Sequence, residues 1–472
     1  MTYPRYTPIL AWVFMCLLAA SPAAQADNAI AEYQAIHQKL RAARTSHVWS
    51  ASLASARDLN QLLNGSPNSL LELARAKVHT DDLAGAFRDL QEFVRMGQAT
   101  DLLTTSPEFA PLRQKPEFGD IQTGMKVNQS AVSLGTLVFR LSDPTLIPED
   151  LDYDPNTKRF FITTVRGKKI ITTDLAGTIT EFAKAPDDWP LLAIKIDPRH
   201  GVIWASEVAL TGFVFVPKAD WGKSAVLGYD LKTGKLLHRI EGPQGSALGD
   251  MALTPDGDVI VSDGDGGGVY VIHAAGEGLE RLDAGDFISP QTPAVPSDGK
   301  KIFVPDYLRG IGRLDVATKQ VRWLNMEGRF ALNGIDGLYL EGQTLLAVQN
   351  GTSPERVVAF QLDPTFSKVV SETIIERSTE TLGDPTHGVI VGNDFYYIAN
   401  SGWDIIDDQG NLKPGAHPSE ARIMRVSLGA FQTTKNKPIN TEDHEVTKTR
   451  RGKTRTADER GFTQIKRGDG GR

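Results

Sequence analysis

The sequence predicts a mainly β protein, a six-bladed β-propeller preceded by a small α-helical domain. Between about residues 28 and 125, apolar residues recur at helical spacing, whereas from Leu137 onward short apolar strands alternate with turns. The strand-and-turn unit then repeats at intervals of 42 to 57 residues. Such intervals are typical of propeller blades built from four strands.

Residues 1–26 have the pattern of a cleavable export signal. Arg5 is followed by twelve apolar residues from Ile9 to Ala20, and then by the triplet Ala24-Gln25-Ala26. A stretch of this length is too short to cross the roughly 30 Å of a membrane's hydrocarbon core, which disfavours a membrane anchor. We therefore expect cleavage after Ala26, a periplasmic or secreted protein, and no membrane span in the mature chain.

The only cysteine of the chain, Cys16, lies inside this signal. The mature protein is therefore expected to have no disulfide, no thiol nucleophile and no thiolate metal site. Without disulfides, an exported chain depends on a large core for its stability, and the length of this one permits such a core.

Residues 27–127 are predicted to form the helical domain. Within 67–97, apolar residues recur on two short segments separated by a polar break at 79–82, and this pair of helices resembles a tetratricopeptide repeat. A single repeat cannot bury its own apolar face, so a cap packed on the next domain is one reading. The other is a groove for a protein partner, and the sequence leaves both open.

Six turn-and-strand units can be aligned along the rest of the chain. Short strands follow turns such as Asp154-Pro155-Asn156 and Pro255-Asp256-Gly257, which is the signature of β-hairpins. No further unit follows Leu428, which favours six blades over seven. One position of the repeat is occupied in turn by Asp150, Ala193, Asp250, Thr292, Asp336 and His387.

The propeller is expected to span residues 130–430 and to close on itself. The first unit offers four strands and the last only three. We predict that the segment 131–141 supplies the missing strand of the last blade, because this pairing removes the exposed edges of an incomplete ring.

Residues 431–472 are predicted to be a disordered basic tail. From 435 onward, eleven Lys and Arg residues stand against six Asp and Glu residues, with few apolar ones. The whole chain has a net charge of −7, so its remainder is acidic and offers no general basic surface for nucleic acid.

Acidic residues gather where the inner strands of the blades are predicted to begin. Glu149 and Asp150 open the first unit, Asp250 the third, Asp336 the fifth, and Asp384 with His387 the sixth. Two enlarged loops, 209–223 and 402–420, belong to the same face. Carboxylates that converge on a narrow channel favour a bound cation such as Ca²⁺ or Mg²⁺. Alternatively, these side chains only cap backbone N–H groups and bind water.

Three of these segments resemble a known family. The runs PEDLDYD (148–154), GDMALTPDGDVIVSD (249–263) and NGIDGLYL (333–340) are similar to the senescence marker protein/gluconolactonase/LRE-like family of six-bladed propellers. In that family a glutamate of the first blade, an asparagine of the fourth and an aspartate of the fifth bind a divalent metal. The metal polarises a sugar lactone, and the aspartate acts as base.

The resemblance assigns roles to particular residues of this chain. It implies that Glu149 and Asp336 are metal ligands and catalytic residues, and that Asp250 contacts the substrate. In the fourth blade the asparagine is absent, and Gln291 with Thr292 stands there. Gln291 is therefore the expected third ligand, with a longer reach. Asn333 and His387 complete the expected substrate contacts, together with Asp250 and Gln291.

Two functions of different classes follow. One is a hydrolase of a lactone or related small ester that depends on Ca²⁺, Mg²⁺ or Zn²⁺, with a small-molecule ligand in the channel mouth. The other is a non-catalytic propeller that binds a ligand or a protein. A channel plugged by Arg309 or Arg356 would favour the second. The sequence contains no serine-nucleophile motif, phosphate loop or dinucleotide fingerprint.

Overall fold

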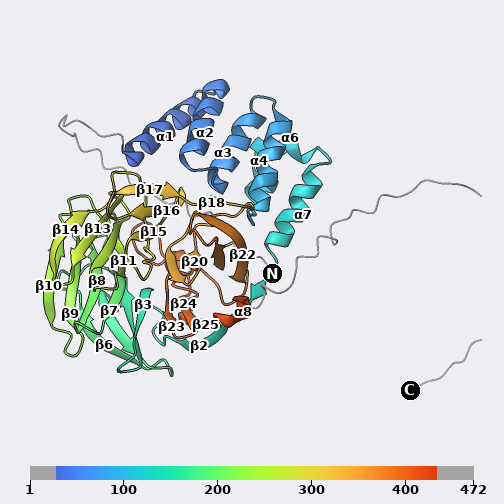
Figure 1. Ribbon diagram of the computed structural model, residues 1–472. Helices are drawn as coiled ribbons and strands as arrows, with labels where there is room; N and C mark the ends of the chain where they lie inside the picture. The colour runs from blue at the N-terminus through green and yellow to red at the C-terminus, as the bar shows by residue number, and fades with distance from the viewer. Residues whose placement is uncertain (1–27, 433–472) are drawn as a thin grey trace, which may run out of the picture. The chain divides into compact units, whose positions relative to one another are not determined.

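A computed structural model describes residues 28–432 and confirms the six-bladed propeller (Figure 1). The predicted export signal, with Cys16, lies outside the described residues, as does the basic tail from 433 onward. The short helix α8 (Gly429–Gln432) occupies the start of the segment predicted as tail. No helix of the described part is both long and apolar enough to cross a membrane.

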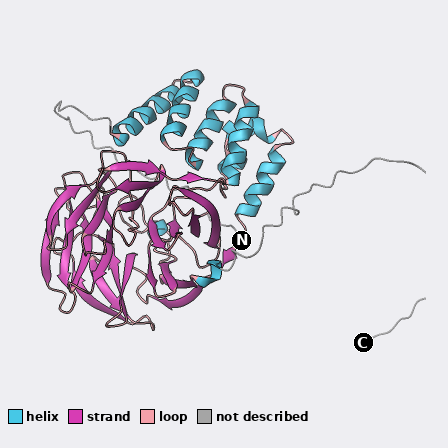
Figure 2. Ribbon diagram, viewed as in Figure 1, coloured by secondary structure: helices cyan, strands magenta, loops and turns pink. Residues whose placement is uncertain are grey.

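The helices from residue 29 to 128 all come before the first strand in the chain, and Figure 2 shows them gathered on one side of the strand domain. The pair expected within 67–97 is present as α3 and α4, and Asp82 caps α4 by accepting a hydrogen bond from the Gly85 N–H at 2.8 Å. The helical elements are α1 (Ala29–Thr45), α2 (Trp49–Leu62), α3 (Pro67–Val78), α4 (Leu83–Arg95), α5 (Leu102–Thr105), η1 (Pro107–Phe109), α6 (Ala110–Arg113) and α7 (Phe118–Asn128).

The helices share a core with the propeller. Leu59 and Leu73 lie in one buried cluster with Ile288 of the fourth blade. The backbone N–H of Ala99 donates to the carbonyl of Ser353 in the fifth blade at 2.6 Å. The helical segment therefore buries its apolar face against the strand domain, as an isolated repeat must.

Blades one, two, three and five each contain four consecutive antiparallel strands, and in each of them the innermost strand comes first in the chain. Blade one contains β3 (Pro148–Asp154), β4 (Arg159–Thr164), β5 (Lys169–Thr173) and β6 (Ile179–Lys184). Blade two contains β7 (Leu191–Asp197), β8 (Val202–Val208), β9 (Ser224–Asp230) and β10 (Leu236–Glu241). Blade three contains β11 (Leu248–Leu253), β12 (Val259–Asp263), β13 (Gly268–His273) and β14 (Glu277–Arg281). Blade five contains β19 (Gly337–Glu341), β20 (Thr344–Gln349), β21 (Arg356–Leu362) and β22 (Lys368–Arg377).

The fourth blade is the least regular. Its sheet consists of β15 (Lys301–Asp306), β16 (Gly310–Asp315) and β17 (Gln320–Trp323), and the short β18 (Asn325–Met326) pairs in parallel with β22 of blade five. In place of an inner strand, 290–296 makes two isolated bridges, Pro290 to Asp306 and Ala294 to Phe303. Three prolines in that segment lack the N–H that a ladder requires, which explains the gap.

The ring closes as predicted, with one correction. The last blade contains β23 (Gly388–Val391), β24 (Asp394–Ile398) and β25 (Arg422–Ser427), and β2 (Thr136–Arg140) pairs antiparallel with β25 as its outer strand. The prediction was wrong for the start of 131–141, because β1 (Val132–Ser133) pairs with β22 of the fifth blade. The chain therefore crosses from one blade to the next at Leu134 and Gly135 before it completes the ring.

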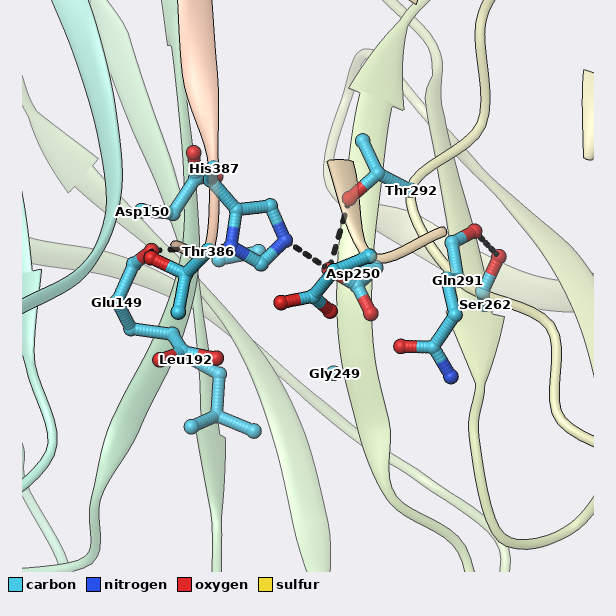
Figure 3. Close-up of polar contacts among 12 residues, drawn as sticks. Glu149, Asp150, Leu192, Gly249, Asp250, Ser262, Gln291, Thr292, Thr386 and His387 are labelled. Carbon is cyan, nitrogen blue, oxygen red and sulfur yellow. Dashed lines mark hydrogen bonds and ion pairs between the residues drawn. The ribbon is translucent and has the colours of Figure 1, made fainter. Parts of the chain in front are cut away.

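A repeated hydroxyl of the second strand of one blade donates to the innermost segment of the next blade, and Figure 3 shows the bond between Ser262 and Gln291. The Ser206 hydroxyl of blade two donates to the Gly249 carbonyl of blade three at 3.0 Å, and the Ser262 hydroxyl of blade three donates to the Gln291 carbonyl at 2.8 Å. Thr163 makes the equivalent bond to the Leu192 carbonyl. These bonds hold the beginnings of the inner strands in register around the channel.

Candidate metal centre

Three predicted site residues lie together where inner strands begin. Glu149 is in β3, and Asp336 and His387 immediately precede β19 and β23. One ligand atom from each lies within 4.8 Å of the others, and all three residues are buried. Figure 3 shows Glu149 and His387 side by side, with Asp250 facing the imidazole. The structure thus brings four of the six predicted site residues to one place.

His387 is held by acceptors on both sides of its ring. Nδ1 lies 2.9 Å from the carbonyl oxygen of Glu149, which can only accept, and Nε2 lies 2.6 Å from Asp250 Oδ1. Burial alone lowers the pKa of His387, but the negative charges of Asp336, Asp150 and Asp250 raise it well above its usual value. His387 is therefore an imidazolium that donates from both nitrogens.

Glu149 and Asp336 each use one carboxylate oxygen for a neutral donor. Trp403 Nε1 donates to Glu149 Oε2, and Asn350 Nδ2 donates to Asp336 Oδ2 at 2.8 Å. Burial and the charge of Asp336 raise the pKa of Glu149 to about 8. Burial also raises the pKa of Asp336 to about 7, although the nearby His387 charge opposes the rise. Each of these carboxyl groups can therefore hold a proton near neutral pH and release it when a cation binds.

Asp150 has a structural role, although it was grouped with the channel acids. It is fully buried, and its Oδ2 accepts from the Ile194 N–H at 2.9 Å and from Lys195 Nζ at 2.5 Å. These bonds hold the Asp150 carboxylate against blade two, whereas the Glu149 carboxylate accepts a hydrogen bond from Trp403 of the last blade. The alternative reading of these acids, as caps for backbone N–H groups, therefore applies to Asp150.

Gln291 and Asn333 do not join the group. The Gln291 amide donates to the Ser289 carbonyl and hydroxyl at 3.3 and 3.2 Å, and Figure 3 draws the side chain on the far side of Asp250 from Glu149. Asn333 lines a small cavity of about 30 Å³ between helices and propeller, and its Oδ1 is buried without a partner. At the repeat position of blade four, the Thr292 hydroxyl instead donates to Asp250 at 2.9 Å.

The two enlarged loops form one wall of the site. The N–H of Val214, in 209–223, donates to the Gln409 carbonyl, in 402–420, at 2.9 Å, and Phe213 packs against Trp403 with ring centroids 6.1 Å apart. The second loop contains the short helix η2 (Trp403–Ile405). Their contact places the Trp403 indole over Glu149 and shields it from solvent.

Neither arginine proposed as a plug binds in this group. Arg309 donates to the Leu62 carbonyl of α2 at 2.9 Å and lies 4.4 Å from the centre of the Trp323 ring. Arg356 is fully buried and bonds to Gln349 and to the Met96 carbonyl beside α4. Both side chains join the propeller to the helical segment instead.

The donor set fits a divalent cation. Each of Glu149 and Asp336 keeps one oxygen without a donor among the described residues, Oε1 and Oδ1 respectively. Hard cations prefer such oxygen ligands, and a bound cation would stabilise the ionised carboxylates against the burial and the neighbouring negative charges that raise both pKa values. His387 would serve as a third ligand only after losing its Nε2 proton to solvent.

Trp403, Asn350 and Lys195 were not predicted from the sequence. Trp403 lies in a loop whose length marked it as functional, so its aromatic residue was a signal that could have been used. Asn350 directly follows β20, and Lys195 lies within β7. Neither has a spacing that distinguishes it from an ordinary strand residue.

The strand topology itself identifies the chain as a six-bladed β-propeller. Neither a protein-family model nor a curated protein sequence matches the chain. Solved structures that are similar to it include propellers of the gluconolactonase and regucalcin types.

Three solved structures illustrate the likeness. A PQQ-bound aldose sugar dehydrogenase from Streptomyces coelicolor has a TM-score of 0.45 and 14% identity, over 63% of this chain and 98% of its own. Regucalcin from Agrobacterium tumefaciens has a TM-score of 0.43 and 14% identity, over 62% of this chain and 95% of its own. A gluconolactonase from Xanthomonas campestris has a TM-score of 0.42 and 13% identity, over 63% of this chain and 97% of its own.

We expect the stability of the metal-free protein to fall as the pH rises from about 5 to 8. In this window Glu149 and Asp336 hold protons in the folded chain that the unfolded chain has lost. His387 acts in the same direction, because its raised pKa contributes stability that is lost as the pH rises. Thermal unfolding in the presence of a chelator measures the slope. Glu149→Gln should flatten it, and an equal slope in that variant would contradict the assignment.

Proposed function

We propose that the chain is an exported, divalent-metal-dependent hydrolase of a lactone or related small ester. The observation that supports this most is the pair of buried carboxylates, Glu149 and Asp336, each of which has an oxygen within 4.8 Å of the other and of a ring nitrogen of His387. Two acids with raised pKa values, held against a protonated imidazole, are characteristic of a reactive centre. The family resemblance of the motifs around these two acids points to the same chemistry.

The residues of the site have distinct roles in this proposal. Glu149, Asp336 and, after losing a proton, His387 would hold the ion. When bound, the ion would act as a Lewis acid toward the ester carbonyl. Asp336 or Glu149 accepts the proton of the attacking water. The water oxygen adds to the carbonyl carbon, the ring C–O bond then breaks, and the carboxyl that took the proton returns it to the leaving oxygen. Asp250 keeps His387 oriented through its 2.6 Å bond.

One observation favours the second class, a propeller that binds without catalysis. The His387 imidazolium balances part of the charge of Asp250 and Asp336. The acids of the channel can therefore be held together without a catalytic role. The helical segment then offers a surface for a protein partner. Arg309 and Arg356 bind the helical segment and do not plug the channel, so they give this alternative no support.

The compartment belongs to the same proposal. The export pattern of residues 1–26 suggests that the mature chain works in the periplasm or outside the cell. Millimolar divalent ions are accessible to a protein in that setting, so a site of modest affinity suffices.

A metal analysis of the purified mature protein tests the proposal first. We expect about one divalent ion per chain, released by a chelator, and hydrolysis of small lactones such as δ-gluconolactone or γ-butyrolactone that stops on chelation and returns with the ion. Asp256→Asn, an exposed residue at the opposite end of β11, is the matched control and should change neither. Retention of the ion without hydrolysis of any lactone or small ester would support the binding propeller.

A further inference from the structure

A second acidic group lies near the candidate metal centre. Asp384 precedes His387 by three residues, its N–H donates to Glu355 Oε2 at 2.7 Å, and its carbonyl accepts from the Ser401 hydroxyl at 2.7 Å. Glu355 immediately precedes β21 of the fifth blade, and Ser401 leads into the loop 402–420. Asp384 is therefore held between the fifth blade and the loop that carries Trp403.

The Asp384 carboxylate has no counter-ion among residues 28–432, and one of its oxygens has no hydrogen-bond donor there. The residue is 5% exposed, and its Oδ2 is enclosed without a hydrogen-bond donor among the described residues. Burial, followed by the charges of Glu355 and Asp404, raises the pKa of Asp384 well above its usual value. Buried carboxylates are almost always paired or hydrogen-bonded, so this one calls for a partner that is not part of the chain.

A ligand that pairs with the Asp384 carboxylate would have to carry a positive charge. Asp384 and Glu355 form no ion pair with a lysine or arginine in the described structure, and the charges that act on Asp384 are the acids Glu355, Asp404, Asp336 and Glu149. An ion held by Glu149 and Asp336 would balance those two acids and leave Asp384 and Glu355 without a cation. A cluster of one sign with little solvent focuses its field on a ligand of the opposite sign.

The geometry distinguishes an organic cation from a second metal ion. In the described part of the chain, Glu149, Asp336 and His387 form the one acidic or histidine group whose ligand atoms lie within 4.8 Å of one another. Asp384, Glu355 and Asp404 therefore do not close around an ion that needs several ligands at 2.0–2.6 Å. An ammonium group needs only one or two acceptors, each at about 2.7–2.9 Å.

We propose that Asp384 and Glu355 bind a primary ammonium group of the ligand, so that the substrate is a small lactone or ester that carries a positively charged amino group. The ester part of this statement rests on the proposed function, whereas the ammonium part does not. Asp384 is bound by Ser401, two residues before the Trp403 that donates to Glu149, so the ammonium site and the metal centre adjoin the same loop and one small molecule can reach both.

Two lactams that the enzyme cannot readily hydrolyse test the ammonium site. 3-Aminopyrrolidin-2-one is cationic at neutral pH, and pyrrolidin-2-one is its neutral counterpart. Isothermal titration of the mature protein, with and without divalent ion, should show at least tenfold tighter binding of the cationic lactam. Asp384→Asn should abolish that preference, and Glu355→Gln should reduce it. Asp256→Asn, remote and exposed, should keep it.

The controls separate this inference from folding and from the proposed function. Asn has the shape of a protonated Asp, so Asp384→Asn should melt no lower than the wild type, and it should keep the divalent ion. Equal affinity for the two lactams, failure to bind the cationic one, or an unchanged preference in Asp384→Asn overturns the inference. Loss of the ion in that variant also overturns it, because Asp384 would then belong to the metal centre. A preference for the cationic lactam without turnover of any lactone contradicts the proposed function alone.

Discussion

Asp336→Asn should lower the affinity for a divalent ion and the rate of lactone hydrolysis by about 100-fold or more. Loss of a residue that only orients a metal ligand costs 10- to 100-fold, and a ligand itself should cost at least the upper end of that range. The variant can keep an acceptor for Asn350 Nδ2 but loses the negative charge that Asp336 would offer to the ion.

The metal-free form of this variant provides the control. Asp336 is buried with a pKa raised to about 7, so replacement by a neutral isostere should not lower the melting temperature in the presence of a chelator. Unchanged metal content together with unchanged turnover in Asp336→Asn would contradict the proposed metal-dependent hydrolysis. A variant that is simply unfolded would be recognised by its melting curve and replaced by Glu149→Gln, which should have the same effect.

Asp150→Ala should destabilise the fold by about 3–5 kcal/mol, the usual cost of removing one partner from a buried ion pair. The change would leave Lys195 without its counter-ion and the Ile194 N–H without its acceptor, between blades one and two. Urea unfolding followed by tryptophan fluorescence measures the loss as a shift of the transition midpoint.

Asp150→Asn is the matched variant for this prediction. It keeps an oxygen for one of the two donors and should cost clearly less than Asp150→Ala. A loss of under about 1 kcal/mol in Asp150→Ala would contradict the interpretation of Asp150 as the link between blades, since a surface residue typically costs that little.

The sequence was sufficient to predict the blades because each turn and its following strand are local features. It was less informative about pairings between distant segments. Alternation in 131–141 predicts a strand, but it cannot say that Val132 and Ser133 pair with blade five while Thr136 begins the pairing with blade six. In blade four, the prolines of 290–296 were visible, and they do remove the inner strand.

The site was predictable in position and less so in side-chain direction. Inner strands all begin at one end of a propeller, which brings Glu149, Asp336 and His387 together. The contacts of each side chain depend on neighbours that no spacing reveals. Gln291 was expected to be a ligand because of where it lies in the chain, yet its amide is used by Ser289 in its own turn.

The most direct test of the metal centre is an anomalous-diffraction map of crystals of the mature protein loaded with Mn²⁺. We predict a single strong peak at the channel, within about 2.0–2.6 Å of Glu149 Oε1 and Asp336 Oδ1, the range of oxygen–metal distances for ions of this class. A strong peak elsewhere on the chain, or no peak at the channel in a fully soaked crystal, would contradict the assignment of these two carboxylates as metal ligands.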